Sequence, residues 1–362
     1  MLCNMGSMET LFHSVYCDGM GKSVNFVQLF SESMKNIALV AGGDSGEYVI
    51  SVNSARIIAQ NLDKEKFRVY LIVISNKKWL FIDDQGVEHP VDKNDFSVQH
   101  QGEKVLFDCA LITIHGTPGE DGKLQGYLDL LGIPYTTSGL LQCSLTFNKH
   151  FCNSLAGHWG IKVARSVKLT RDQKPATPAE VMQHVDLPVF VKPNKGGSSL
   201  GTSFVKNPDE LLPAIDLCLQ HDNEALIEEY IEGIELTCGA YMKKGEVQVL
   251  PVTEIVSKTE ARFFDYQAKY TQGAADEITP ARVPDEVTHR VQQTTAFLYK
   301  KFELRGICRL DYIYSKSELF FLEANITPGM SERSIVPQQA AHVGISLQQL
   351  FTDVIEETLA AQ

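Results

Sequence analysis

The sequence has 362 residues, of which 44% are hydrophobic and 22% are charged, which is an ordinary globular composition and a length sufficient for two or three domains. A formal net charge of −12 excludes the usual signature of nucleic-acid or anionic-membrane binding, and no apolar run is long enough to span a bilayer. The eight cysteines are scattered without a C-x-x-C pair, which indicates reduced, buried thiols and a cytoplasmic protein.

The first 33 residues differ from the rest of the chain. Residues 1–33 have mixed polarity without a clear period, and they lack the cationic start and apolar core of a signal peptide. Met34 directly precedes a clean strand pattern. We therefore interpret residues 1–33 as an N-terminal extension, tag-like or from an upstream start codon, and expect it to be disordered or loosely packed.

Residues 34–148 alternate apolar runs with helical spacing, which predicts an open α/β domain. Residues 35–41 form a short apolar run of the kind found in buried parallel strands, and helical spacing begins after a Gly-rich turn at Ser51. Further strands are predicted at 67–74, 108–114 and 133–136, with a helix at 124–131. Ligands of open α/β domains bind at the carboxyl ends of strands, so the polar turns there are expected to face a site.

One helix is predicted over residues 141–158, and a different alternation follows it. Strands are predicted at 162–170, 187–193, 202–206 and 225–230, with helices at 178–184 and 208–219. The loop NKGGSSLG, residues 194–201, joins two strands, whereas a P-loop joins a strand to a helix. It is typical of a flap whose backbone N–H groups close over phosphates, and a plain hairpin turn is the alternative.

Charged residues flank this loop on neighbouring strands. Lys192 ends an apolar strand, which favours an anionic ligand, because such a lysine is rarely buried without an anionic partner. Glu228 and Glu229 end the next strand and are able to accept hydrogen bonds from ribose or adenine. The alternative is that they are surface charges, and for Glu229 we favour that interpretation.

The last part of the chain has strands predicted at 235–242 and 246–256, and helices at 285–302 and 346–360. Between them, residues 257–282 are polar and poorly periodic. A loop of this length in a compact enzyme is usually functional, so we interpret it as a lid. Lys269 and Tyr270 lie within it and are able to reach a site.

The chain is organised around residues 306–334. Arg309 and Asp311 are two residues apart on one strand pattern, as are Glu323 and Asn325 on the next, so each pair shares a face. If the two strands pair as a hairpin, one face carries a guanidinium, two carboxylates and an amide among apolar neighbours. Oxygen ligands of this kind suit Mg²⁺ with phosphate rather than zinc. A salt-bridge network is the alternative.

Taken together, these motifs resemble the ATP-grasp superfamily and, within it, the D-alanine–D-alanine ligases, over residues 35–360. The motifs agree in order and spacing: GGDSGE (42–47), HGTPGEDGKLQG (115–126), NK (148–149), VKPNKGGSSLG (191–201), IEEYIEGIE (227–235), DYQAKY (265–270), RLD (309–311) and EANITPGMSERSIVP (323–337). The resemblance implies a mixed α/β and α+β class, with an N-terminal α/β domain at 34–148 and ATP-grasp subdomains at 149–232 and 233–362. It also implies ATP-dependent joining of two D-alanines through an acylphosphate, for peptidoglycan precursor synthesis.

The resemblance assigns roles to individual residues. It implies that ATP is bound by Lys149, Lys192, Gly197, Ser199, Glu228, Glu235 and Lys269. It implies that two Mg²⁺ or Mn²⁺ ions are held by Asp311, Glu323 and Asn325, and that Arg309 and the Gly329 N–H stabilise charge at the acyl carbon.

For the substrates, the resemblance implies an anchor for the ammonium of the first D-alanine, completed on closure by the flap and the lid: Glu47, Ser198 and Tyr270. His115 is implied near the first substrate, with helix capping as the alternative. Ser334 and the backbone of Ile335 are implied at the carboxylate of the second D-alanine.

One departure from the family pattern and three alternatives accompany this assignment. Tyr48 and Val49 replace the basic and acidic residues that usually follow the anchoring Glu47. By the resemblance, a Tyr at position 270 implies D-alanine rather than D-lactate as second substrate, whereas a D-serine product stays open. A nucleotide-binding module without ligase activity is the third alternative, and the intact oxygen-ligand cluster argues against it. By analogy with the family, a homodimer is expected, with ATP and D-alanine as the ligands.

Overall fold

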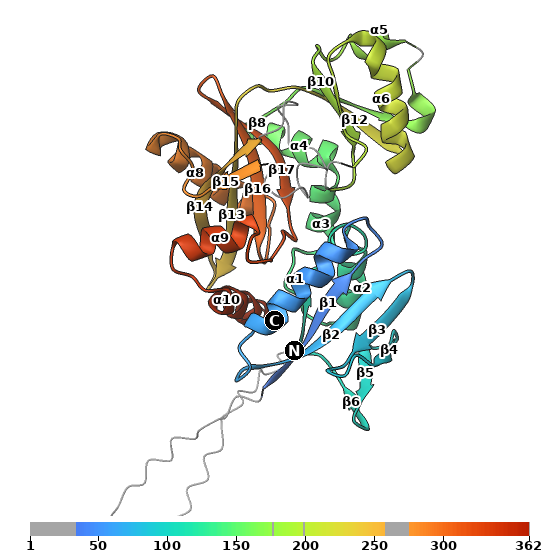
Figure 1. The fold of residues 1–362 in the computed structure, drawn as a ribbon, viewed down its shortest axis with the longest axis vertical. Helices are drawn as coiled ribbons and strands as arrows, with labels where there is room; N and C mark the ends of the chain where they lie inside the picture. Colours follow the sequence, from blue (N-terminus) through green and yellow to red (C-terminus); the bar gives the residue numbers. More distant parts are fainter. Residues whose placement is uncertain (1–33, 176, 198–199, 258–274, 362) are drawn as a thin grey trace, which may run out of the picture. The chain divides into compact units, whose positions relative to one another are not determined.

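The structure is a computed structural model that describes residues 34–175, 177–197, 200–257 and 275–361 (Figure 1). The predicted N-terminal extension and most of the predicted lid lie outside these residues, as do four predicted site residues: Ser198, Ser199, Lys269 and Tyr270. The described residues form three β-sheets with helices packed on them.

The first sheet belongs to the N-terminal part of the chain. In sheet order its strands are β6 (Glu103–Val105), β5 (Ser97–His100), β4 (Glu88–Asp92), β3 (Lys78–Ile82), β2 (Phe67–Ser75), β1 (Lys35–Gly42) and β7 (Cys109–Ile112). β1 is parallel to β2 and β7, whereas β2 to β6 pair antiparallel. The strands predicted at 35–41, 67–74 and 108–114 are confirmed. The strand predicted at 133–136 is wrong, because this segment forms only an isolated bridge between Tyr135 and Ala110.

Two helices accompany the first sheet, α1 (Tyr48–Asn61) and α2 (Lys123–Leu131). α1 packs on β1 and buries Ser51, Ser54, Ala55 and Ile58, while the C-terminal helix α10 (Leu347–Ala360) contacts both α1 and β7. The parallel core of the sheet is completely apolar from Ile37 to Ala41, as the sequence pattern predicts.

The second sheet has the order β11 (Ser203–Val205), β10 (Val189–Pro193), β12 (Glu224–Glu229) and β9 (Ser166–Thr170), and all its pairs are antiparallel. Helices α5 (Pro178–Val181) and α6 (Pro208–His221) accompany it (Figure 1). A capping box fixes the start of α6, since Asn207 accepts from the third helical N–H and Glu210 reaches back to the backbone of Asn207.

The third sheet has the order β15 (Ala275–Ile278), β14 (Glu246–Ser257), β13 (Ile234–Lys243), β16 (Cys308–Ser315), β17 (Glu318–Asn325) and β8 (Lys162–Val163). Helices α8 (Asp285–Lys301) and α9 (Ile335–His342) pack on β13 and β14. The single strand predicted at 162–170 is wrong, because β8 and β9 belong to different sheets.

The helix predicted over 141–158 is also interrupted. α3 (Leu140–Phe147) ends at Asn148, and α4 (Lys149–His158) begins directly after it. The extended backbone of Asn148 breaks the helix, and its side chain accepts from the Phe151 N–H as the N-cap of α4. The break therefore places Lys149 in the first turn of α4. Both helices pack on β17, and the division of the chain at 148/149 and 232/233 stays a prediction.

Two further expectations concern the whole chain. All six cysteines in the described residues are buried and free: Cys109, Cys143, Cys152, Cys218, Cys238 and Cys308. Among the helices of the described residues, none combines the length and the apolar character that a bilayer crossing requires.

Candidate active site

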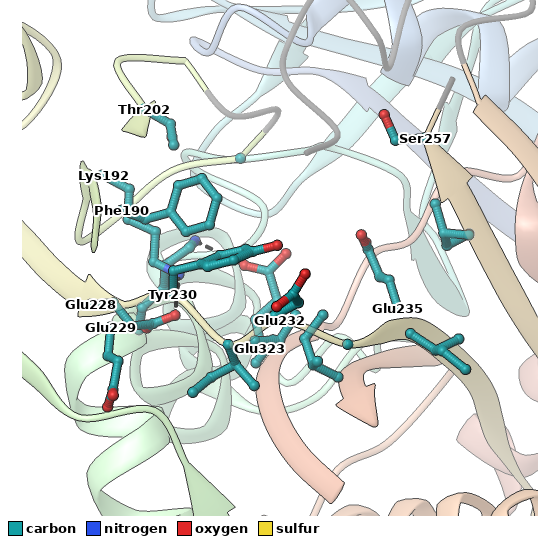
Figure 2. Close-up of a pocket in the computed structure, with 18 of the residues that line it drawn as sticks. Phe190, Lys192, Thr202, Glu228, Glu229, Tyr230, Glu232, Glu235, Ser257 and Glu323 are labelled. Carbon is teal, nitrogen blue, oxygen red and sulfur yellow. Dashed lines mark hydrogen bonds and ion pairs between the residues drawn. The ribbon is translucent and has the colours of Figure 1, made fainter. Parts of the chain in front are cut away.

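Two cavities that share a wall contain every predicted site residue that the structure describes. The first lies between the second and third sheets and is drawn in Figure 2. The second is lined by the N-terminal turns, by the β16–β17 hairpin and by the segment that leads into α9. Lys149, Gly197 and Glu323 line both cavities, so they lie where the two cavities meet.

The β16–β17 hairpin supplies the charged face that the two-residue spacing predicts. Arg309 pairs with Asn325, and Asp311 pairs with Glu323, in antiparallel register. The guanidinium of Arg309 donates to both carboxylate oxygens of Asp311, at 2.9 and 2.8 Å, and the Asn325 amide donates to Asp311 at 2.9 Å. The hydroxyl of Thr237 on β13 also donates to Asp311. The salt-bridge network and the cavity-lining cluster are thus the same residues.

Lys149 lies opposite this hairpin and connects it to the glycine flap. Its ammonium lies 3.2 Å from the Glu323 carboxylate and donates to the Gly196 carbonyl at 2.7 Å. Burial lowers the pKa of Lys149, but the carboxylates of Glu323, Glu120 and Glu228 together outweigh this effect and leave the pKa above its usual value. Lys149 is therefore a fixed cation between the two cavities.

The first cavity combines a buried ion pair with aromatic rings. The Lys192 ammonium donates to Glu228 Oε1 at 3.0 Å, while Glu228 Oε2 is buried and has no hydrogen-bond partner in the described residues. Phe190 and Tyr230 lie beside this pair, with ring centroids 5.8 Å apart (Figure 2). Glu235 lines the same cavity. An unpartnered buried carboxylate oxygen beside aromatic rings fits a ligand that has both a planar ring and hydrogen-bond donors.

Glu229 also borders the first cavity, but its carboxylate is engaged by an arginine, so the surface role that the sequence analysis favours stays a prediction. Its carboxylate accepts from Arg165 at 3.0 and 3.2 Å, and Figure 2 shows its side chain extending away from Lys192. Consecutive residues of a strand face opposite sides, which separates Glu228 from Glu229.

Glu47 lies in the second cavity, at the start of α1. The backbone N–H of Glu47 donates to Ser45 Oγ at 3.2 Å, and Ser45 in turn donates to the carbonyl of His115 at 2.7 Å. A Cβ placed on Gly197 would come within 2.7 Å of a Glu47 carboxylate oxygen, so a side chain at this position would require the Glu47 carboxylate to shift. Tyr48 and Val49, which follow Glu47, are exposed, and the backbone of Glu47 is held through Ser45.

His115 faces the same cavity in a buried position. Burial lowers its pKa, although the Glu47 carboxylate raises it. Its Nε2 is buried and lacks a hydrogen-bond partner in the described residues, which fits a contact to a bound substrate better than a helix cap.

Sequence reasoning gave no role to Glu120 and Glu277, which also line the second cavity. Burial raises the pKa of Glu120 to about 7, and the Gly116 N–H donates to it at 2.7 Å. Burial also raises the pKa of Glu277, which accepts from Gln338 at 2.8 Å. The available signal for Glu120 was its place in the HGTPGEDG turn, since a carboxylate at a strand end in an α/β domain is a candidate site residue.

The segment after the hairpin closes the second cavity. Ser334 is the N-cap of α9, yet its side chain makes no cap hydrogen bond and instead contacts Ser331 Oγ at 2.8 Å. Gly329 lies against Ser334, because a Cβ on Gly329 would come within 2.9 Å of the Ser334 hydroxyl. Ile335 begins α9 and lines the second cavity together with Ser334, so the N-terminus of this helix borders the cavity. A helix N-terminus of this kind is suited to a carboxylate.

A nucleotide-sized cavity joined to an oxygen-ligand hairpin, on sheets of this topology, defines an ATP-grasp enzyme. Family models agree with this class: the D-ala D-ala ligase N-terminus matches residues 36–138 and the D-ala D-ala ligase C-terminus matches residues 155–356. The chain belongs to the D-alanine–D-alanine ligase family.

Individual relatives match along nearly their whole length. A D-alanine–D-alanine ligase of Flavobacterium johnsoniae is 46% identical over 90% of this chain and 100% of the relative, and one of Parabacteroides distasonis is 45% identical over 90% and 98%. Among solved structures, the VanG D-Ala:D-Ser ligase of Enterococcus faecalis has a TM-score of 0.80 at 31% identity, covering 89% of this chain and 99% of that one. The Bacillus anthracis D-alanine–D-alanine ligase complexed with ATP has a TM-score of 0.71 at 27% identity, covering 90% and 98%.

Proposed function

We propose that this protein uses ATP to join two molecules of D-alanine into D-alanyl-D-alanine, for peptidoglycan precursor synthesis. The observation that carries the proposal is the shared wall of the two cavities, where Lys149, Gly197 and Glu323 meet. A carboxylate is a poor electrophile, so a phosphoryl group must reach it before an amine is able to attack. The shared wall supports a path for that group from a nucleotide in the first cavity to a substrate in the second.

In the first cavity, the proposed ligand is ATP. The open oxygen of Glu228 is suited to accept from the adenine or ribose, and Glu235 to contact the other end of the nucleoside. Lys149 and Lys192 supply fixed positive charge for the phosphates, and Gly197 supplies flap backbone. Ser199 and Lys269 stay predictions.

Asp311, Glu323 and Asn325 are proposed to hold two Mg²⁺ or Mn²⁺ ions. The donor set fits, because all three residues offer hard oxygens from adjacent strands in register. When bound, the ions supply charge neutralisation for the transferring phosphoryl group. Arg309, which already orients Asp311, is proposed to stabilise negative charge at the acyl oxygens, together with the Gly329 N–H.

In the second cavity, the proposed ligands are the two D-alanines. Glu47 is proposed to bind the ammonium of the first, with His115 beside it. Ser334 and the Ile335 N–H are proposed to bind the carboxylate of the second, at the N-terminus of α9. Ser198 and Tyr270 are proposed to complete the first-substrate site. A site closed by flap and lid excludes water, which would otherwise hydrolyse the acylphosphate.

The second candidate product is D-alanyl-D-serine, which the solved VanG D-Ala:D-Ser ligase makes relevant. The test is a competition in which D-alanine, D-serine and D-lactate are offered together with ATP and Mg²⁺, and the products are identified by mass spectrometry. We expect D-alanyl-D-alanine as the main product. A main product that contains serine or lactate would replace the proposal, and phosphate release that does not need D-alanine would refute ligase activity.

A homodimer and a cytoplasmic location stay proposals that rest on the family resemblance and on the buried thiols.

A further inference from the structure

A cluster of metal-ligand side chains lies outside the active site, on the antiparallel part of the first sheet. Asp83, His89 and His100 each offer one ligand atom, and the three atoms all lie within 4.8 Å of one another. None of the three lines either active-site cavity. The cluster therefore has no part in the function proposed above.

The sheet register brings these residues together from neighbouring strands. Phe81 on β3 pairs with His89 on β4, and Val91 on β4 pairs with Val98 on β5. Continuing the second register by two residues places His89 opposite His100. Asp83 follows Phe81 by two residues, so it lies on the face that carries the two histidines.

Backbone hydrogen bonds orient the carboxylate of Asp83. Its Oδ1 accepts from the N–H of Gln85 at 3.0 Å and of Val87 at 2.8 Å. Its Oδ2 is left for His89 Nε2, at 2.9 Å. In metal sites, a ligating carboxylate is typically held in place by hydrogen bonds from neighbouring groups, as the carboxylate of Asp83 is here.

Aromatic packing orients the two imidazoles. His89 stacks on Phe81 with centroids 5.5 Å apart, and His100 meets the same ring edge-on at 5.1 Å. Tyr70 also packs against His100, at 6.2 Å. Within the described residues, no hydrogen bond reaches the ring nitrogens of His100, which also lines a surface hollow beside Tyr70. An ordinary His89–Asp83 ion pair does not account for a second, half-buried imidazole directed at the same point.

We propose that Asp83, His89 and His100 bind one divalent transition-metal ion of the zinc class, with water as a further ligand. Two imidazole nitrogens and one carboxylate oxygen form a borderline donor set, which prefers Zn²⁺ or Co²⁺ to Mg²⁺. The ion enters through the hollow beside His100. It ties β3, β4 and β5 together at one end of the sheet, so it stabilises this part of the fold rather than the catalytic groups.

The test uses the full chain, stripped with a chelator and titrated with Co²⁺ in the absence of nucleotide. We expect about one equivalent to bind and to give the visible absorption of nitrogen-ligated, tetrahedral Co²⁺, which an all-oxygen site does not produce. Zn²⁺ abolishes the band by displacement. His89→Gln and His100→Gln each lower the affinity at least about tenfold. His289→Gln, at an exposed position on α8, is the matched control and keeps the band.

Two further measurements keep the test decisive. Zn²⁺ raises the thermal midpoint of the wild type and not of His100→Gln, because an ion stabilises only a fold that binds it. Should the glutamine variants not fold, the histidine resonances of the wild type replace them, and Zn²⁺ must shift those of His89 and His100. No Co²⁺ band in the wild type, an undiminished band in both variants, or resonances that do not move would each overturn the proposal.

Discussion

The HGTPGEDG turn and the β16–β17 hairpin each bring a carboxylate to the second cavity, but give it different surroundings. Glu120 in the turn accepts from the Gly116 N–H, and burial raises its pKa to about 7. Asp311 in the hairpin is held by the two-pronged Arg309 guanidinium and by the Asn325 amide. The two carboxylates thus differ in their partners: Asp311 is gripped by a guanidinium, whereas burial outweighs the hydrogen bonds to Glu120 and the charge of Lys149, and raises the pKa of Glu120.

The largest effect is expected for Glu323→Gln, which removes a negative charge from the β16–β17 hairpin. Turnover should fall more than about a hundredfold, because a metal ligand stabilises the transferring phosphoryl group by several kcal/mol. Steady-state kinetics with ATP, Mg²⁺ and D-alanine measures this, and circular dichroism checks the fold. Glu318→Gln, at a half-exposed position on the same strand that lines neither cavity, is the matched control and should retain turnover. Normal turnover in Glu323→Gln would remove the metal assignment.

Arg309→Lys keeps the positive charge of the hairpin but removes the fork that grips Asp311. We expect turnover to fall about a hundredfold, because a lysine ammonium is unable to hold both Asp311 oxygens and also face the acyl oxygens. The fold should persist, since the buried carboxylate keeps a cation nearby. Arg290→Lys is the control, because Arg290 forms an exposed pair with Glu318. Equal kinetics for the two variants would show that Arg309 acts only as a charge.

Glu120→Gln tests the carboxylate of the HGTPGEDG turn, and its effect on the free energy of unfolding depends on pH. The folded-state pKa of about 7 lies above the usual 4.5, so wild-type stability is lost as pH rises through this interval. Glutamine stays neutral at every pH, so the variant should be more stable than the wild type by up to about 3 kcal/mol at pH ~8 and equal to it near pH ~4. Urea unfolding across this range measures the difference, with the exposed Glu88→Gln as control. A constant difference at all pH values would contradict the raised pKa.

The hairpin was predictable from the sequence and the turn was not, for a physical reason. Arg309, Asp311, Glu323 and Asn325 are placed by the two-residue period of strands, which is local. The surroundings of Glu120 depend on burial by chain segments distant in sequence, which no local pattern reports.

The same distinction applies to the rest of the fold. The apolar parallel strands were predictable, because complete burial leaves an unbroken apolar run. Strands β3 to β6 have only three to five residues each, and each has exposed or half-buried positions, so their pattern is weak. The break at Asn148 follows from a side-chain cap and a bridge to Lys195, which become visible only once the flap is placed.

The smallest effect separates Glu228 from its neighbour Glu229 and extends the comparison to two carboxylates on one strand. Glu228→Gln should raise the KM for ATP about tenfold, because it weakens a buried pair with Lys192 and changes the acceptor that faces the nucleotide. Glu229→Gln removes only an exposed pair with Arg165, worth less than about 1 kcal/mol, so its KM should stay within about twofold of wild type. ATP titrations at saturating D-alanine measure both, and each variant is the control for the other. If both KM values change equally, the alternation of the strand does not separate the roles of the two carboxylates. Glu228 would then act at the protein surface, like Glu229, and not on the nucleotide.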